Sequence, residues 1–363
     1  MSKSNHKKMS KPPQDGNTKQ MDIFRALLSP DNDVSALSNL LDTWDQIPKF
    51  HVTQAKQKRI REEGAITTVQ DEVVLGGDSY EININPAIIK VDGKNQLYFP
   101  SETEEVIETI LRKMLLDQNL GIHRNKPQST WVKFSIRMIR DELKKVGKTR
   151  SNAQIRHSLY ILTRSILIVK KNGKTIHTGG ILSGWIDKPN EHLESDHEDA
   201  LSAIQFSTMV SRSISELDFR QYDYLTTTTM KNPVSRWLMK RLSIHFRGAG
   251  RNYKKDNGHN SFKIDYSVIV SESLLLDSIK LEKDRKKKVR KAINELIKSD
   301  VILSSEESGI ELETAQFGSD GKTIIGTTFN LCATQSFTAK MKASMKQRNT
   351  IEHNQKVNAV IDK

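Results

Sequence analysis

The sequence contains a single cysteine, Cys332, among its 363 residues. One cysteine cannot form an intramolecular disulfide, and it cannot build a cysteine-rich zinc site. A disulfide-stabilised secreted fold is therefore excluded, and the composition fits a reducing cytoplasm. We expect Cys332 to fill space in a core.

Long hydrophobic runs are also missing. No segment approaches the roughly 20 consecutive apolar residues of a membrane span. The first residues, Met-Ser-Lys-Ser-Asn-His-Lys-Lys, are not followed by the apolar stretch of a signal peptide. We therefore expect a cytoplasmic protein with no membrane partner.

Complete catalytic motifs are absent as well. Three Gly-Lys-Thr triplets, at residues 147–149, 173–175 and 321–323, resemble the end of a phosphate-binding loop. The first glycine of that loop would have to occupy the positions of Glu142, Ile168 and Gln316, so none of them is one. No His-Glu-x-x-His, Cys-x-x-Cys or His-hydrophobe-His pattern is present. DNA nicking by Tyr222 or Tyr224 would need further catalytic residues that we do not find in the sequence. We therefore expect that the protein is not an enzyme and that it binds no metal or cofactor.

Positive charge is what the sequence has in excess. Lys and Arg number 57 against 44 Asp and Glu, which gives a net charge of +13 and an isoelectric point near 9.5. Contacts to phosphates supply most non-specific affinity for nucleic acids. The balance favours a polyanionic partner.

The N-terminal quarter divides into an arm and an extension. Residues 1–20 are polar and basic, with too little apolar surface to offset the entropy of ordering, so we predict a disordered arm. Residues 21–94 form the extension. It has amphipathic segments at residues 21–28 and 34–44, which end before Pro30 and Pro48, and a strand at residues 80–91.

Residues 95–186 have the element order of a winged helix. Ser101 and Glu104 form a capping box for the first helix. Asn172-Gly173, between apolar alternating runs, is a strong signal for a type I′ hairpin, which would be the wing. The predicted elements are a strand at 131–134, helices at 135–146 and 151–163, and strands at 166–171 and 174–186.

The same order recurs after an acidic linker at residues 187–200. In residues 201–338, Asn232 and Pro233 start a helix that runs to residue 246. A strand at 261–266, helices at 267–276 and 281–298, a strand at 301–305 and a hairpin around 318–321 follow. Residues 339–363 are read as a basic flexible tail. The predicted fold class is α+β, with two tandem winged-helix domains.

The helix at residues 281–298 carries a basic face. Its apolar residues recur at helical spacing, so the opposite side faces outward. Like charges four residues apart destabilise an isolated helix by a few tenths of a kcal/mol per pair, a cost that a polyanion would offset. A solvated charged face is the alternative interpretation. The candidate DNA-binding residues are Lys283, Lys286, Lys287, Arg290, Lys291 and Asn294.

The first copy supplies a second set of candidates. Arg bonds guanine and Gln or Asn bonds adenine, whereas Lys more often holds phosphate, so the first domain is the candidate base reader and the second the stronger backbone clamp. An exposed histidine without a task is the alternative for His157. The candidates are Lys148, Arg150, Asn152, Gln154, Arg156 and His157, with Lys170, Lys171, Lys174 and Lys322 in the two hairpins.

Taken together, these features resemble those of a known family, the two-winged-helix replication initiators of iteron-containing, theta-replicating bacterial plasmids. The resemblance covers roughly residues 95–335 and rests on the architecture and on segments such as "FSIRMIRDELKKVGKTRSNAQIRHSLYILTRSILIVKKNGK" and "LEKDRKKKVRKAINELIKSDVIL". It implies base-contacting helices at residues 150–157 and 283–294.

The resemblance also implies a function and partners. Monomers of such a protein bind direct repeats in double-stranded origin DNA and help to open an adjacent AT-rich segment. They recruit the host initiator ATPase and the replicative helicase. Dimers repress the initiator's own gene, and the protein is associated with the plasmid or nucleoid of a bacterium.

Two rival functions stay open. A winged-helix transcription regulator would use the same contacts without a role in replication. A relaxase or recombinase would cut DNA, but the sequence lacks the His-x-x-Arg box of tyrosine recombinases.

Overall fold

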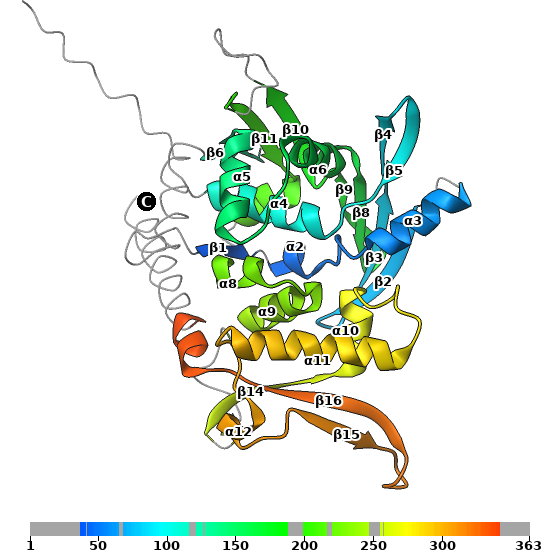
Figure 1. Ribbon diagram of the computed structural model, residues 1–363, viewed down its shortest axis with the longest axis vertical. Helices are drawn as coiled ribbons and strands as arrows, with labels where there is room; N and C mark the ends of the chain where they lie inside the picture. The colour runs from blue at the N-terminus through cyan, green and yellow to red at the C-terminus, as the bar shows by residue number, and fades with distance from the viewer. Residues whose placement is uncertain are drawn as a thin grey trace, which may run out of the picture.

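The computed structural model describes residues 37–40, 42–64, 68–115, 121–125, 128–187, 199–215, 220–246, 255–256 and 258–341. Over these residues the protein is a mixed α and β structure of helices and small antiparallel sheets (Figure 1). The predicted arm at 1–20, the helix at 21–28 and most of the predicted linker and tail lie outside them. Within this described part, no helix combines the length and apolar character of a membrane span.

The N-terminal extension differs from its prediction in two places. Of the amphipathic segment predicted at residues 34–44, the described residues form a short strand from residue 37 to 40 and the start of a short helix at residue 42. The strand predicted at 80–91 is split at Pro86, because proline lacks the N–H that a sheet partner needs. The elements are β1 (Leu37–Leu40), α2 (Asp42–Gln46), α3 (Gln54–Glu63), β2 (Val69–Leu75), β3 (Asp78–Asn85), β4 (Ala87–Val91) and β5 (Lys94–Tyr98).

The next segment follows the predicted order closely. The capping box of Ser101 and Glu104 is present at the start of its helix, and Asn172 and Gly173 have positive φ angles of 48° and 75°, as a type I′ turn requires. The strand predicted at 174–186 is two strands. The elements are α4 (Glu102–Met114), β6 (Gly121–Asn125), β7 (Gln128–Phe134), α5 (Ile136–Lys145), α6 (Asn152–Arg164), β8 (Ile166–Lys171), β9 (Lys174–Gly179) and β10 (Leu182–Asp187).

The hairpin β8–β9 is part of a larger sheet. Strand β3 pairs with β8 along its length, which gives the strand order β2-β3-β8-β9. The buried residues of β3, among them Ile82 and Ile84, face the same core as Leu167 and Val169 of β8. The extension is therefore packed into the first half of the protein.

The chain returns to the first half after the predicted linker. β11 (Ser202–Phe206) lies between β7 and β10 in the sheet β10-β11-β7-β6, and it is followed by α7 (Thr208–Ser215), β12 (Arg220–Asp223) and α8 (Tyr224–Thr229). The first core continues to Tyr224 and the second begins at Met230, apart from Leu274, which packs into the first. The structure thus changes core at residues 224–230, later than the expected linker at 187–200.

The helix predicted to start at Asn232 is present, with Asn232 as N-cap and Pro233 in the first turn. One prediction was wrong: residues 301–305 do not form a strand. Ile302 makes only an isolated bridge to Ala333, and the capping box of Ser304 and Glu307 starts a short helix there. The elements are α9 (Pro233–His245), β13 (Lys255–Asp256), β14 (His259–Asp265), α10 (Tyr266–Ser273), α11 (Glu282–Lys298), α12 (Ser305–Ser308), β15 (Glu313–Phe317) and β16 (Ile324–Cys332).

Cys332 is buried in this half, as expected for a core residue. Strand β16 lies between β14 and β15 in the sheet β13-β14-β16-β15, and α9 packs on α11. In Figure 1 the β15–β16 hairpin extends from the lower end of the molecule.

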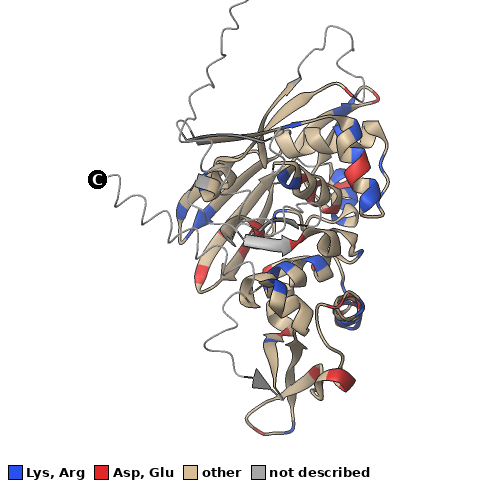
Figure 2. Ribbon diagram, turned by 90° about the vertical axis from the view of Figure 1, so that its left-hand side faces the viewer, with Lys and Arg blue, Asp and Glu red and all other residues tan. Residues whose placement is uncertain are grey.

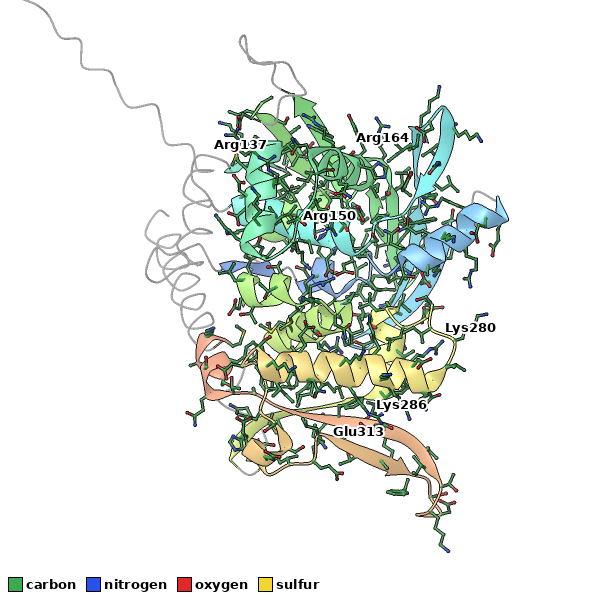
Figure 3. All side chains as sticks on the ribbon, viewed as in Figure 1. Arg137, Arg150, Arg164, Lys280, Lys286 and Glu313 are labelled. Atoms are coloured by element: carbon green, nitrogen blue, oxygen red, sulfur yellow. The ribbon has the colours of Figure 1, made fainter. Side chains whose placement is uncertain are left out.

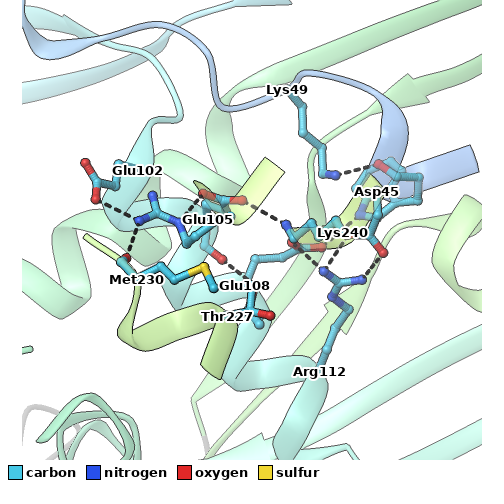
Figure 4. A network of polar contacts seen from close by, with 12 residues as sticks. Asp45, Lys49, Glu102, Glu105, Glu108, Arg112, Thr227, Met230 and Lys240 are labelled. Atoms are coloured by element: carbon cyan, nitrogen blue, oxygen red, sulfur yellow. Dashed lines mark hydrogen bonds and ion pairs between the residues drawn. The ribbon is translucent and has the colours of Figure 1, made fainter. Parts of the chain in front are cut away.

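Buried ion pairs join the two halves (Figure 4). Glu105, on α4, accepts hydrogen bonds from Arg236 Nε at 3.1 Å and from Lys240 Nζ at 2.8 Å, both on α9. Arg236 Nη1 also contacts Glu102 at 3.1 Å and donates to the Met230 carbonyl at 2.9 Å. A second group lies beside this one, where Arg112 donates to both oxygens of Asp45 at 2.7 Å.

Glu105 makes the stability of this junction depend on pH. Burial alone would raise the pKa of Glu105, but the charges of Lys240 and Arg236 outweigh it and lower the pKa from 4.5 to about 2. A carboxylate whose pKa is lowered by folding stabilises the folded state fully above its unfolded pKa, and this contribution disappears as the pH falls toward the folded value.

We therefore predict that Glu105 contributes about 3 kcal/mol at neutral pH, lost between about pH 4.5 and pH 2. Urea unfolding across this range should show a steeper loss of stability for the wild type than for Glu105→Gln. Glu62→Gln, at an exposed position on α3, is the control and should follow the wild type. Parallel curves for the wild type and Glu105→Gln would contradict the assignment.

Candidate nucleic-acid interface

Helix α11 presents one face to the core and the other to solvent. Val289, Ala292, Ile293 and Leu296 are buried, and the helix packs on α9. Its first turn contains Glu282 and Asp284, whose charges favour a helix N-terminus. The side opposite the buried stripe is where the predicted DNA-binding residues lie.

Four of these residues are exposed: Lys283, Lys287, Lys291 and Asn294. None of the three lysines makes an ion pair with another residue in the described part of the chain. The three lysines repeat at four-residue spacing, so they lie in one row along the helix. We call Lys283, Lys287 and Lys291 the lysine row.

The other two predicted DNA-binding cations of α11, Arg290 and Lys286, are paired within the protein. Arg290 donates from Nε and Nη2 to both carboxylate oxygens of Glu313, each at 2.7 Å, and this hydrogen bonding raises the pKa of Arg290. Lys286 lies 3.4 Å from Glu282 and donates to Thr327 Oγ1 at 3.3 Å. These contacts connect α11 to the β15–β16 hairpin (Figure 3).

The N-terminal turn of α6 uses several of its predicted base readers internally. Gln154 Oε1 accepts from the backbone N–H of Ser151 at 3.0 Å, which completes a capping box. Asn152 Oδ1 accepts from Arg140 at 3.2 Å. Arg150 donates to the Thr149 carbonyl at 2.7 Å and to Thr103 Oγ1 at 3.3 Å.

The rest of α6 is partly covered. His157 is half-buried with its ring 4.4 Å from the ring of Tyr98, edge to face, and burial lowers its pKa. Ile161 packs with Ala87 and Ile89 of β4. In the first turn of α6, Gln154 is exposed and Arg156 further along is half-buried, while Tyr160 and Arg164 are exposed toward the end of the helix.

The predicted wing lysines differ in how they are placed. Lys170 lies 2.7 Å from Glu81 and Lys171 lies 2.7 Å from Asp78, both on β3. Lys174 and Lys322 are exposed near their turns. Lys148 is half-buried, and burial together with the charge of Arg236 lowers its pKa.

The basic segments of both halves lie on one side of the molecule. Helix α11 runs across the view of Figure 1, whereas α6 is seen nearly end-on above it. In Figure 2, α11 is seen end-on at the right-hand edge, and blue segments of the upper half lie along the same edge. A single polyanion could therefore contact both.

A cavity of about 530 Å³ lies between the two halves. Its walls include Phe50 and Trp237 and the charged residues Glu105, Lys240 and Arg150. Arg150 is thus placed at the junction as well as next to α6. Among the residues that the structure describes, no cluster of three or more His, Cys, Asp or Glu is arranged to hold a metal ion.

The acidic partners of Arg290 and Lys170 could not be predicted from the sequence. Glu313 is 23 residues from Arg290, and Glu81 is 89 residues from Lys170. The alternation of apolar and polar residues in β3 predicts a strand, but it does not predict which other strand β3 pairs with. The β4–β5 hairpin that covers α6 could not be predicted either, for the same reason.

Comparisons with known proteins give a limited likeness. No family model and no curated protein matches the chain. Among solved structures, a selenomethionine derivative of domain 2 and domain 3 of RctB is similar with a TM-score of 0.42 and 12% identity, over 73% of this chain and 91% of that one. A second structure of RctB domains 2-3 has a TM-score of 0.41 and 10% identity, over 76% and 94%.

Glu313 is expected to weaken the attraction of α11 for polyanions. Glu313→Gln removes a negative charge beside the helix and leaves Arg290 without its ionic partner, so the protein should elute from immobilised heparin at higher salt than the wild type. Glu62→Gln removes the same charge from α3 and is the control. If both variants eluted at equally increased salt, heparin binding would depend on net charge alone, and α11 would not be a specific binding site for polyanions.

Proposed function

We propose that the protein is a non-enzymatic replication initiator that binds double-stranded DNA through two winged-helix domains. The open lysine row of α11 is the observation that carries the proposal. The two proposed domains correspond to the two cores, so the extension and β11 belong with the first.

The winged-helix interpretation is supported by the order of elements in each half. In the first, α5 and α6 precede the β8–β9 hairpin, and in the second, α10 and α11 precede the β15–β16 hairpin. In folds of this type the helix before the hairpin enters the major groove and the hairpin contacts the neighbouring backbone. This assigns α6 and α11 as the recognition helices.

The charges on α11 favour duplex DNA over a merely solvated surface. Arg290 and Lys286 are paired with acids of the same domain, but the lysine row is not paired within the described chain. Three aligned ammonium groups repel one another unless an anion lies along them. A phosphate backbone is a polyanion of suitable length, and binding it releases its counterions.

The two domains would then contribute differently. The first turn of α6 offers Gln154, Asn152 and Arg156, which can bond base edges. Each of these side chains has an interaction partner within the free protein. On binding DNA, each would exchange that partner for a base. α11 offers mainly lysines, which hold phosphates without reading sequence.

The finer parts of the proposal follow from the family that the sequence resembles. They are binding to direct repeats at an origin, opening of an adjacent AT-rich segment, recruitment of the host initiator ATPase and helicase, and repression of the initiator's own gene as a dimer.

The lysine row should control affinity for any duplex sequence. Replacing Lys283, Lys287 and Lys291 together with Gln should weaken binding and flatten the plot of log affinity against log salt by about 0.9 per lost phosphate contact. Fluorescence anisotropy of a labelled random-sequence duplex, titrated at several salt concentrations, measures both effects.

The matched control is Lys58→Gln with Arg59→Gln, which removes exposed cations on α3 that are paired with Glu62 and Glu63. The control should keep the wild-type salt slope. An unchanged slope in the α11 variant would remove the main support for the DNA-binding function.

Replication itself can be tested with the DNA that flanks the gene. A plasmid without its own origin, carrying this gene and its flanking DNA, should be maintained in a suitable bacterial host. The same plasmid with the lysine row replaced by Gln should be lost. DNA binding without maintenance would favour a transcription regulator, and cleavage of the supercoiled plasmid with divalent metal would favour a DNA-processing enzyme.

A further inference from the structure

The tip of the β15–β16 hairpin exposes three large apolar side chains. Phe317 is 55% exposed, Ile324 is 64% exposed and Ile325 is 68% exposed. They are among the most exposed large hydrophobic residues of the described chain, and they lie next to one another across the hairpin. Water is a poor environment for such a group, so the tip is a candidate contact surface.

The pairing of the two strands brings these residues together. Gln316 pairs with Gly326 and Phe317 pairs with Ile324, so the register shifts and Ile325 has no opposite residue. An extra residue of this kind is a β-bulge, which twists a strand and changes the direction of its side chains. Both isoleucines are consequently open to solvent beside Phe317.

The hairpin below the tip is held by polar contacts. Gln316 Nε2 donates to Asp265 Oδ1 at 2.7 Å and to Thr328 Oγ1 at 2.8 Å. This side chain crosses Gly326, where a Cβ atom would overlap it. At the far end, Asp320 Oδ1 accepts from the backbone N–H groups of Lys322 and Thr323, which orders the turn.

The hairpin is also fixed to the basic helix. Glu313 at the start of β15 binds Arg290, and Thr327 of β16 accepts from Lys286. The tip therefore projects from a strand pair attached to the same helix that carries the lysine row. Lys322, exposed at the turn, adds a positive charge beside the three apolar residues.

We propose that Phe317, Ile324 and Ile325 form a wedge that enters the minor groove of duplex DNA and unstacks a base step. The inference rests on the proposed DNA-binding function and specifies how the second domain deforms the duplex. Apolar side chains inserted between bases unstack and kink DNA, most readily at flexible pyrimidine–purine steps. Lys322 at the turn and the cations of α11 fit a polyanion better than they fit an apolar partner protein, and the carboxylate of Asp320 at the same turn is held by the backbone N–H groups of Lys322 and Thr323.

The wedge predicts a change in DNA topology that is separate from affinity. A closed circular plasmid is relaxed by a topoisomerase in the presence of the protein, the protein is removed, and the linking number is read on a gel. The wild type should lower the linking number, because unstacking unwinds the helix. Phe317→Ser/Ile324→Ser/Ile325→Ser should bind the plasmid within about threefold of the wild type, since phosphate contacts dominate affinity, yet lose the topological change.

Two further variants keep the result interpretable. Val74→Ser/Ile88→Ser/Ile186→Ser replaces three other exposed apolar residues, on strands of the first half, and should behave as the wild type. Phe317→Trp keeps a flat apolar side chain at the tip and should retain the topological change. Circular dichroism of each variant establishes that it is folded.

The outcomes separate the wedge from the proposed function. If the triple Ser variant binds and still lowers the linking number, the wedge is overturned, and the apolar tip is left as a surface for another protein. If the wild type binds without any change in linking number, the wedge is overturned while DNA binding stands. If the wild type does not bind duplex DNA, the proposed function fails and the wedge fails with it.

Discussion

The buried pairing of Glu105 with Arg236 and Lys240 is the constraint on which the arrangement of the two halves depends. Glu105 lies in the first turn of α4, and α4 packs against α6. Arg236 and Lys240 lie on α9, and α9 packs against α11. Separating the halves would break these ion pairs, and removing one partner while the halves stay packed would leave an uncompensated charge at the junction, which is costly. The ion pairs thus hold α6 and α11 in place relative to each other, which bears on the proposed function because that function requires one duplex to contact both helices.

Local signals were enough to predict the helices of this junction and the face of α11. The capping box at Ser101, the cap at Asn232, the Asn172-Gly173 turn and the apolar stripe of α11 each depend on residues close in sequence, and all are present. Pairings between distant segments could not be predicted. Strand β3 binds β8, and β11 inserts between β7 and β10, because these edges complete a buried core. Alternation alone predicts a strand but does not select its neighbour.

The same distinction applies to the candidate site. The lysine row was predicted as a row and is open in the structure, because helical spacing determines which side chains face outward. The pairing of Arg290 with Glu313 and of Lys170 with Glu81 brings together residues from different elements. In sequence, all these cations look equivalent. In the folded chain, some hold their own hairpins in place, and others keep their charge available for a partner.

The central position of β11 also determines the order in which the chain can fold during synthesis. Strands β7 and β10 are translated before residues 202–206, yet in the finished sheet they do not touch each other and are both bonded to β11. Until the ribosome has released that segment, each of them exposes an unpaired edge that can pair with another nascent chain. A fragment that stops at residue 187 would keep those edges permanently. The edges of β7 and β10 that face β11 are therefore paired, and protected from pairing with other chains, only when the expressed chain includes β11.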